Sequence, residues 1–294
     1  MKRRVSISVL FGVPATILVL TLCACAGAGS GGHTTTGPSA TGSGETIVTP
    51  GTVAAAQAMV DAFTAVRPSD SPPQHFTVTR GDFLRGAEDF DVNAYFNAFT
   101  HLSVEPGYLL DYLYRFDGMG GRPFIYVRPS GQEPYASFDA YAAAVPLEDT
   151  GTTGNRAYAQ EYLDHIRVDD TAEGFFQLAT LRLMDDQFYQ YWHSGYDDTT
   201  VVCDKAGLER TMAAAGADFN LRGLPSSVQK QARELDLSPA VTLGDGTTVG
   251  VHVVTFSKWG GFLGHTFTIG RAFPHAFLAD QTETLVKYDC GVQF

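Results

Sequence analysis

The chain has 294 residues, of which 20 are Lys or Arg and 32 are Asp or Glu, and it carries a formal net charge of −12. An acidic chain with no basic run argues against nucleic acid as a partner, since phosphate binding needs clustered Lys and Arg. It argues equally against docking on an anionic lipid surface through charge. The length is compatible with one large domain behind a short N-terminal segment.

The N-terminal 22 residues have the order of a secretory signal, with a basic head at residues 2–4 and an apolar run over residues 5–22. An uncleaved transmembrane anchor is the alternative, because the run nearly reaches the ~20 residues that span a bilayer. The run ends in Leu22-Cys23-Ala24-Cys25. This ending resembles the lipobox of bacterial lipoproteins, which has an aliphatic residue, a tolerant position, a small residue and then the acylated cysteine.

The resemblance implies that Cys25 is lipidated and that the chain is cut between Ala24 and Cys25, so that Cys23 leaves with the signal. Cys23 fits less well as the acylated residue, because Leu22 before it is too large. Two or more acyl chains hold a protein stably on a membrane. We therefore expect a lipid-anchored protein of the cell membrane or outer membrane, with its domain on the extracytoplasmic side. A plain cleaved signal remains an alternative.

Residues 25–50 are predicted to be the lipidated cysteine followed by a flexible linker. They are dominated by Gly, Ser, Thr and Ala and have too few apolar side chains to offset the entropy of ordering. A coil of this length spans roughly 25–30 Å. Removal of residues 1–24 leaves 17 basic and 32 acidic residues, a net charge of −15. The remainder, residues 51–294, is predicted to be one extracytoplasmic domain.

Two cysteines remain in that domain, Cys203 and Cys290. Outside the cytoplasm an even pair favours a disulfide. Neither cysteine lies in a CxxC pattern, which speaks against a redox or zinc role. The chain-entropy model gives such a bridge roughly 4–5 kcal/mol of stabilisation.

The first half of the domain alternates helical and strand patterns. Residues 54–66 have apolar side chains at helical spacing, and Pro68 follows as a stop. Residues 108–129 predict two strands around a glycine-rich turn, although the first arm could also be a short helix. Further helices are expected at 137–144 and 155–163.

The strongest helical pattern covers residues 172–193. It has one apolar stripe, with Asp170 and Glu173 as a capping pair and Gly195 as the end. The stripe consists of Leu178, Leu181, Met184, Phe188 and Tyr191. A strand at 199–203 and a helix at 227–237 follow.

The last 55 residues predict strands separated by two glycine turns, at 244–246 and 260–261, with a final strand at 283–292. The sum is an α+β fold, a single domain in which antiparallel hairpins and a C-terminal β-meander pack with several helices. A two-lobed body is the alternative.

Common catalytic and cofactor motifs are absent from the sequence: there is no phosphate-binding loop, no HExxH and no G-x-S-x-G. No cofactor and no metal site are therefore expected. His252 and His265 fall on the two arms of one expected hairpin, where they could face each other, although ordinary strand histidines are the simpler interpretation.

The richest chemical segment is residues 188–198, at the expected end of a helix. Here His193 could act as a general base beside Asp197 or Asp198, or the two carboxylates could hold a hard cation. A solvated turn is the alternative. Two further candidates are weaker. Trp259 beside Lys258 at a hairpin tip, together with Tyr196, could bind a ligand, and His101, Glu105 and Asp111 lie within a short span.

Two functions follow from these patterns. The first is a membrane-anchored lipoprotein whose aromatic-rich surface binds a protein, glycan or peptide. The alternative is a tethered hydrolase that uses His193, Asp197 and Asp198.

Overall fold

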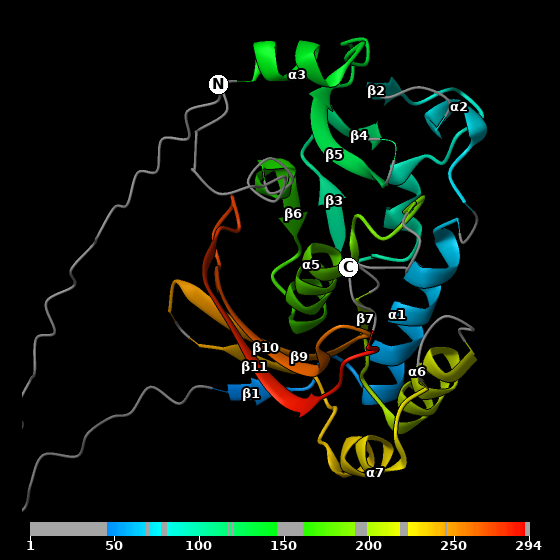
Figure 1. Ribbon diagram of the computed structural model, residues 1–294. Coiled ribbons are helices and arrows are strands. Elements are labelled where there is room, and N and C mark those ends of the chain that lie inside the picture. Colours follow the sequence, from blue (N-terminus) through cyan, green and yellow to red (C-terminus); the bar gives the residue numbers. More distant parts are fainter. Residues whose placement is uncertain are drawn as a thin grey trace, which may run out of the picture. The chain divides into compact units, whose positions relative to one another are not determined.

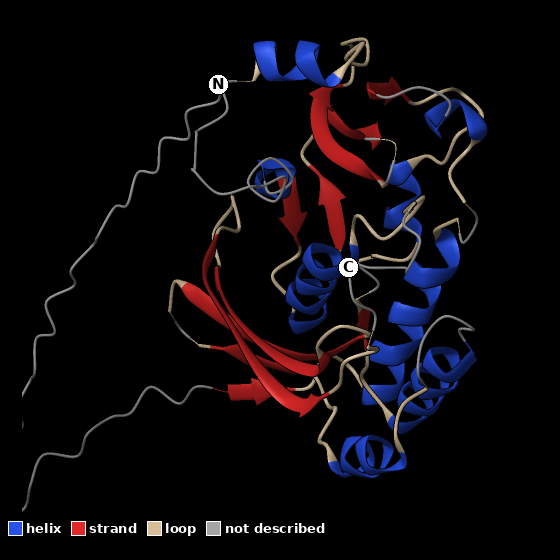
Figure 2. Ribbon diagram, in the orientation of Figure 1, coloured by secondary structure: helices blue, strands red, loops and turns tan. Residues whose placement is uncertain are grey.

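The computed structural model describes residues 46–68, 71–77, 81–116, 118, 120–145, 161–191, 199–217, 223–244 and 246–291. All of them belong to one compact unit, Ser43–Phe294. The unit combines helices with antiparallel sheets, which confirms the expected α+β class (Figures 1 and 2).

The largest sheet is the C-terminal β-meander extended by two earlier strands. Its order is β1-β8-β9-β10-β11, and β7 pairs with β9 beyond the end of β8. Every pairing in it is antiparallel. The strands are β1 (Thr46–Val48), β7 (Thr200–Val201), β8 (Ala240–Leu243), β9 (Thr248–Ser257), β10 (Gly261–Gly270) and β11 (Phe277–Lys287). The last strand begins six residues earlier than expected from residue 283.

Two smaller sheets are built from strands between residues 81 and 168. The expected hairpin at 108–129 is confirmed, and an extra edge strand, β2, joins it. The other is a two-stranded ribbon of β3 and β6. These strands are β2 (Gly81–Leu84), β3 (Leu102–Val104), β4 (Tyr108–Phe116), β5 (Gly121–Pro129) and β6 (Ile166–Val168).

The helices agree with the sequence in most places. The expected helices at 54–66, 137–144 and 227–237 are found within a few residues, whereas 205–217 forms a helix that was not expected. Of the span 155–163, only residues 161–163 are described, and they lie in a 3₁₀ turn. The helical elements are α1 (Val53–Val66), α2 (Gln74–Thr77), η1 (Val92–Asn97), α3 (Phe138–Ala144), η2 (Glu161–His165), α5 (Ala172–Met184), α6 (Lys205–Ala217) and α7 (Ser226–Glu234).

Helix α5 is shorter than the apolar stripe predicted. Its N-cap is Thr171, whose hydroxyl accepts from the Gly174 N–H at 3.0 Å. Asp170 is not the cap, because it has φ 63° and pairs with Arg271. The helix ends at Met184, so Phe188 and Tyr191 of the stripe lie beyond it. The proposed stop at Gly195 lies outside the described residues.

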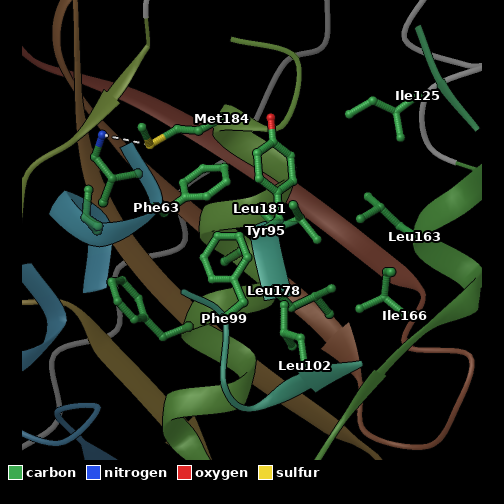
Figure 3. Close-up of a cluster of buried hydrophobic side chains, with 14 of the residues drawn as sticks. Phe63, Tyr95, Phe99, Leu102, Ile125, Leu163, Ile166, Leu178, Leu181 and Met184 are labelled. Carbon is green, nitrogen blue, oxygen red and sulfur yellow. Dashed lines mark hydrogen bonds between the residues drawn. The ribbon is translucent and has the colours of Figure 1, made fainter. Parts of the chain in front are cut away.

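The core surrounds α5, which is buried on nearly all sides between the main sheet and the β3–β6 ribbon. Aromatic rings from α1 and η1 meet its apolar face (Figure 3). Phe63 lies edge-on to Tyr95, with ring centroids 4.7 Å apart, and contacts Phe99 at 4.4 Å. Such ring pairs contribute beyond the area that they bury.

The linker ends earlier than residue 50. Thr46–Val48 pair in register with Val241–Leu243 of β8 and so belong to the folded unit. Their sequence, Thr-Ile-Val, is entirely β-branched and favours a strand. Residues 1–45, which include the signal, Cys25 and most of the linker, lie outside the described part of the chain. None of the described helices is long and apolar enough to cross a membrane.

The expected disulfide is not formed in the structure: Cys203 and Cys290 are both buried, with free thiols. The sheet explains why. Cys203 follows Val202, whose N–H bonds to the Val254 carbonyl, whereas the Cys290 N–H bonds to the Lys258 carbonyl. The two carbonyl partners, Val254 and Lys258, lie several residues apart, and an extended chain covers about 3.3 Å per residue. The two cysteines are therefore held too far apart for a disulfide, which needs Cα atoms within about 7 Å.

Candidate functional site

The structure places the sequence candidates in different surroundings. His193, Tyr196, Asp197 and Asp198 lie outside the described residues. Trp259 is in the turn between β9 and β10, half-buried against an apolar cluster, so it is not an exposed platform at a hairpin tip. Lys258, its neighbour, lines a groove that is described below.

His252 and His265 do not face each other. The register pairs His252 with Thr266 and His265 with Val253, which puts the two imidazoles on opposite faces of the β9–β10 hairpin. Each ring bonds to a threonine hydroxyl, His252 to Thr266 at 3.2 Å and His265 to Thr255 at 2.8 Å. They are therefore ordinary strand histidines.

His101, Glu105 and Asp111 also serve separate purposes. Asp111 is fully buried, and its two oxygens are bonded by the guanidinium groups of Arg85 (3.0 Å) and Arg128 (2.9 Å). It is thus the centre of an ion network inside the β2-β4-β5 sheet. A carboxylate buried between two arginines is out of reach of a substrate, so we interpret Asp111 as a structural ion.

The other two residues belong to a polar face on the β3–β6 ribbon. His101 Nδ1 lies 2.7 Å from Asp169 at one end of the ribbon, and His165 Nδ1 lies 2.9 Å from Glu105 at the other. Arg167 sits between these pairs and covers the Phe273 ring at 4.5 Å. Each pair joins a residue next to β3 to a residue next to β6, so the two pairs link the strands at both ends of the ribbon.

The aromatic side chains do not gather on the surface among the described residues. Most of the Phe and Tyr rings are in the core. The large apolar side chains that remain exposed are few and dispersed: Tyr108, Tyr191, Phe273 and Leu278. The part of the chain that the structure describes therefore offers no broad aromatic face.

Among the described residues, a groove between α1 and α6 is a candidate site, with a volume of about 400 Å³. The two helices lie side by side (Figure 1), and each lines the groove with residues spaced i, i+3, i+4, i+7 and i+8. That spacing is one face of a helix. The lining from α1 is Gln57, Val60, Asp61, Thr64 and Ala65, and that from α6 is Gly207, Arg210, Thr211, Ala214 and Ala215.

Small side chains on α6 leave space between the two helices, and residues of the main sheet form the bottom of the groove. Thr200 of β7, Phe256 of β9 and Lys258 complete the lining. The floor is apolar, because Val60, Phe256 and Ala215 are each buried there. Alanine and glycine on α6 face this floor where larger residues would fill it.

Polar groups are fixed around the rim by Gln57, which is itself buried. Its Oε1 accepts from the Cys203 N–H at 2.8 Å, and its Nε2 donates to Asp61 at 2.9 Å. Asp61 in turn pairs with Arg210 across the groove at 2.5 Å. One buried amide thus ties α1 to the start of α6 and orients the carboxylate at the rim.

An apolar floor with a few oriented polar groups suits the binding of a small organic molecule. The described lining residues of the groove include no histidine, and burial raises the pKa of the nearby Cys203 thiol to about 12. Nor do the described residues hold a cluster of three His, Cys, Asp or Glu side chains fit for a metal ion.

A buried carboxyl lies elsewhere, just past the end of α5. Asp185 accepts a hydrogen bond from the Tyr162 hydroxyl at 2.5 Å, and its carbonyl accepts from Tyr95 at 2.7 Å. Burial, reinforced by the neighbouring Asp186, raises the pKa of Asp185 to about 8. Because Asp185 is enclosed in the core, we interpret it as a structural acid and not as a site for a substrate.

Of the residues singled out from the sequence, Lys258 lines the groove; the other lining residues were not predicted. The usable signal was the run 205–217, in which Leu208, Met212 and Ala215 recur at helical spacing. Comparison with known proteins adds nothing to this picture: no family model, no curated protein and no solved structure matches the chain.

Proposed function

We propose that this chain is a lipid-anchored extracytoplasmic binding protein whose domain holds a small molecule in the α1–α6 groove. Two lines of support are independent. Residues 1–25 resemble a lipoprotein signal, with Cys25 as the lipidated residue. The groove is the observation that carries the binding activity, because it joins an apolar floor to a short set of oriented polar groups.

The size of the groove favours a small ligand over a protein partner. Sites for small molecules typically have volumes of roughly 300–1,000 Å³, and the groove, at about 400 Å³, is at the lower end of that range. A protein partner would instead need an area of about 800 Å² on each side. We therefore place ligand recognition in the groove and leave the exposed aromatic side chains without a part in it.

The test is to fill the groove with one side chain. The protein is the chain from Cys25 onward with Cys25→Ser, and the probe is N-phenyl-1-naphthylamine, a neutral apolar dye that fluoresces on leaving water. Ala214→Phe adds a ring inside the groove and should weaken dye binding at least about tenfold, since a ring excludes the ligand. Ala213→Phe, on the preceding residue of α6 and outside the lining, should leave binding unchanged.

Circular dichroism and a thermal melt would show that both variants fold. If the two variants bind the dye equally, the dye site is not the groove and the proposed binding activity is refuted. If the wild-type chain binds no dye, the proposal fails at the first step. Loss confined to Ala214→Phe supports it.

A further inference from the structure

We propose that residues 167–170 and residues 270–275 form an acid-sensitive latch between the β3–β6 ribbon and the turn from β10 to β11, and that protonation of His275 opens it. The latch lies outside the lining of the α1–α6 groove. The inference is therefore independent of the proposed function, and it assigns to this part of the fold a change of conformation in response to pH.

Three polar contacts join the two segments of the latch. Each contact uses one residue in or just after β6 and one residue of the turn, so the ribbon is held against the main sheet at several points. The contacts are the Arg167 guanidinium over the Phe273 ring (4.5 Å), the Val168 N–H with His275 (3.2 Å), and the Asp170 carboxylate with Arg271 (2.7 and 2.9 Å).

The contact made by His275 requires a neutral imidazole. The Val168 N–H can only donate, so Nε2 of His275 accepts it at 3.2 Å and carries no proton. The proton of the neutral ring is then on Nδ1, which donates to the Gly270 carbonyl at 3.2 Å. A second proton, on Nε2, would point at the Val168 N–H and break this hydrogen bond.

Burial keeps the ring neutral at neutral pH. His275 is only 6% exposed, and its ring meets the rings of Phe175 and Phe273 edge-on. This burial lowers the pKa of His275, because the charged ring would lose its water. A histidine with a lowered pKa stabilises the fold above its usual pKa of about 6.5, and this contribution is lost as the pH falls through the folded pKa. The latch is therefore closed at neutral pH and opens in acid.

The charged groups around the ring act in opposite directions. Arg167 on β6 disfavours the imidazolium, and Asp170 favours it. Arg271 of the turn holds Asp170 in an ion pair, and the neighbouring Asp169 is paired with His101. Burial is the largest of the effects on the ring, so the ring titrates below its usual pH.

The ion pair between Asp170 and Arg271 remains while the ring titrates. Its hydrogen bonds hold the pKa of Asp170 below the usual range of a carboxyl, which is itself about two units below that of histidine. Mild acid therefore breaks the contact of His275 and leaves this ion pair in place. We expect the opening to be local and reversible for this reason.

NMR of the 15N-labelled chain from Cys25, with Cys25→Ser, tests the latch from about pH 7.5 to about pH 4.5, a range that includes the usual histidine pKa. At the upper end the ring nitrogen shifts of His275 should place the proton on Nδ1. As the pH falls, the ring and the Val168 amide should titrate together, with a midpoint below about 6.5. The hydrogen-exchange protection of that amide, corrected for the intrinsic effect of pH, should fall at least about tenfold, the size of one lost hydrogen bond. The readout is local because buried Asp185 also changes the global stability with pH.

Three variants identify the group that responds. His275→Gln keeps an acceptor for the Val168 N–H but does not titrate, so the amide should lose its response to pH. His252→Gln, at a strand histidine that bonds to Thr266, should keep the response. Asp170→Asn removes the charge that favours the imidazolium, and asparagine tolerates the φ of 63° at this position. The midpoint in this variant should therefore move to lower pH.

Each outcome decides for or against the latch. A joint titration of ring and amide that His275→Gln abolishes supports it. The latch is refuted if the ring carries its proton on Nε2 at neutral pH, if the ring does not titrate within the range, or if it titrates while the Val168 amide is unchanged. A response that persists in His275→Gln also refutes it. If that variant does not fold, the ring and the amide of the wild-type chain still separate these outcomes.

Discussion

Single buried side chains determine how the domain responds to reagents and pH. The two thiols are the first case: both are buried, and burial raises the pKa of the Cys203 thiol to about 12. The thiolate is the reactive form of cysteine, so the folded chain with Cys25→Ser should react with a thiol reagent very slowly, on the timescale of unfolding.

The number of thiols distinguishes the structure from the disulfide that the sequence favoured. In denaturant without reductant, two thiols per chain should be labelled, as counted by mass spectrometry of a chain that begins at Cys25 and carries Cys25→Ser. A count of zero would show that Cys203 and Cys290 are bridged and would contradict the structure.

Asp185 predicts a pH dependence of stability. An unfolded Asp titrates near pH 4, whereas burial, together with Asp186, raises the pKa of folded Asp185 to about 8. Between these values the folded state binds a proton that the unfolded state has lost. The free energy of unfolding should therefore fall as pH rises from about 4 to about 8, by at most about 1.4 kcal/mol per pH unit, and then level off.

Asp185→Asn should remove this slope, because the amide keeps an acceptor for the Tyr162 hydroxyl but does not titrate. Urea unfolding across the same pH window measures it. Glu88→Gln, at an exposed carboxyl, is the matched control and should keep the slope. Equal slopes in Asp185→Asn and wild type would show that Asp185 is ionised in the folded protein.

At the scale of elements, the contact of α1 with α6 depends on one glycine. A Cβ at Gly207 would collide with the side-chain amide of Gln57, which is held by the Cys203 N–H and Asp61. We expect Gly207→Ala to lower the free energy of unfolding by about 1–3 kcal/mol through this overpacking. Because Gln57 orients the rim of the groove, dye binding should weaken as well.

Gly131→Ala is the control, since a Cβ there meets nothing within 4 Å. Chemical denaturation and dye titration of both variants complete the comparison. An unchanged stability in Gly207→Ala would mean that Gln57 is not held as the structure has it.

Elements made of nearby residues were predictable, and those made of distant ones were not. The β4–β5 hairpin and the C-terminal meander follow from alternation and glycine turns in one stretch of chain. The β3–β6 ribbon joins His101 to Asp169, 68 residues away, and the groove joins Asp61 to Arg210, 149 residues away. Patterns within a short stretch of sequence do not predict contacts between residues so far apart.

The same reason explains why the helix predicted at 172–193 is longer than the helix in the structure, which ends at Met184. Periodicity continued through Phe188 and Tyr191, but Tyr189 adopts φ 53°, in the left-handed region. Phe188 remains buried by packing on Tyr112 and Phe90 from other elements. Apolar residues therefore continue at helical spacing beyond the end of the helix because they pack against other elements, and not because the helix continues.

At the scale of the whole molecule, the lipid anchor is the prediction with most consequence. Metabolic labelling with an alkyne fatty acid in a bacterial host should place label on the full chain, and Cys25→Ser should abolish it. Cys23→Ser should keep it, because the proposed cleavage before Cys25 removes Cys23 with the signal. Label that survives in Cys25→Ser but not in Cys23→Ser would move the lipidated residue to Cys23.

Strand β1 gives that anchor a mechanical consequence. The chain enters the folded unit through Thr46–Val48, which are held antiparallel to the edge of β8 over three residues. For a domain tethered by its N-terminus, traction on the tether acts first on this short pairing and only then on α1. Because α1 lines the groove, detachment of β1 would pass tension directly to a helix of the proposed ligand site.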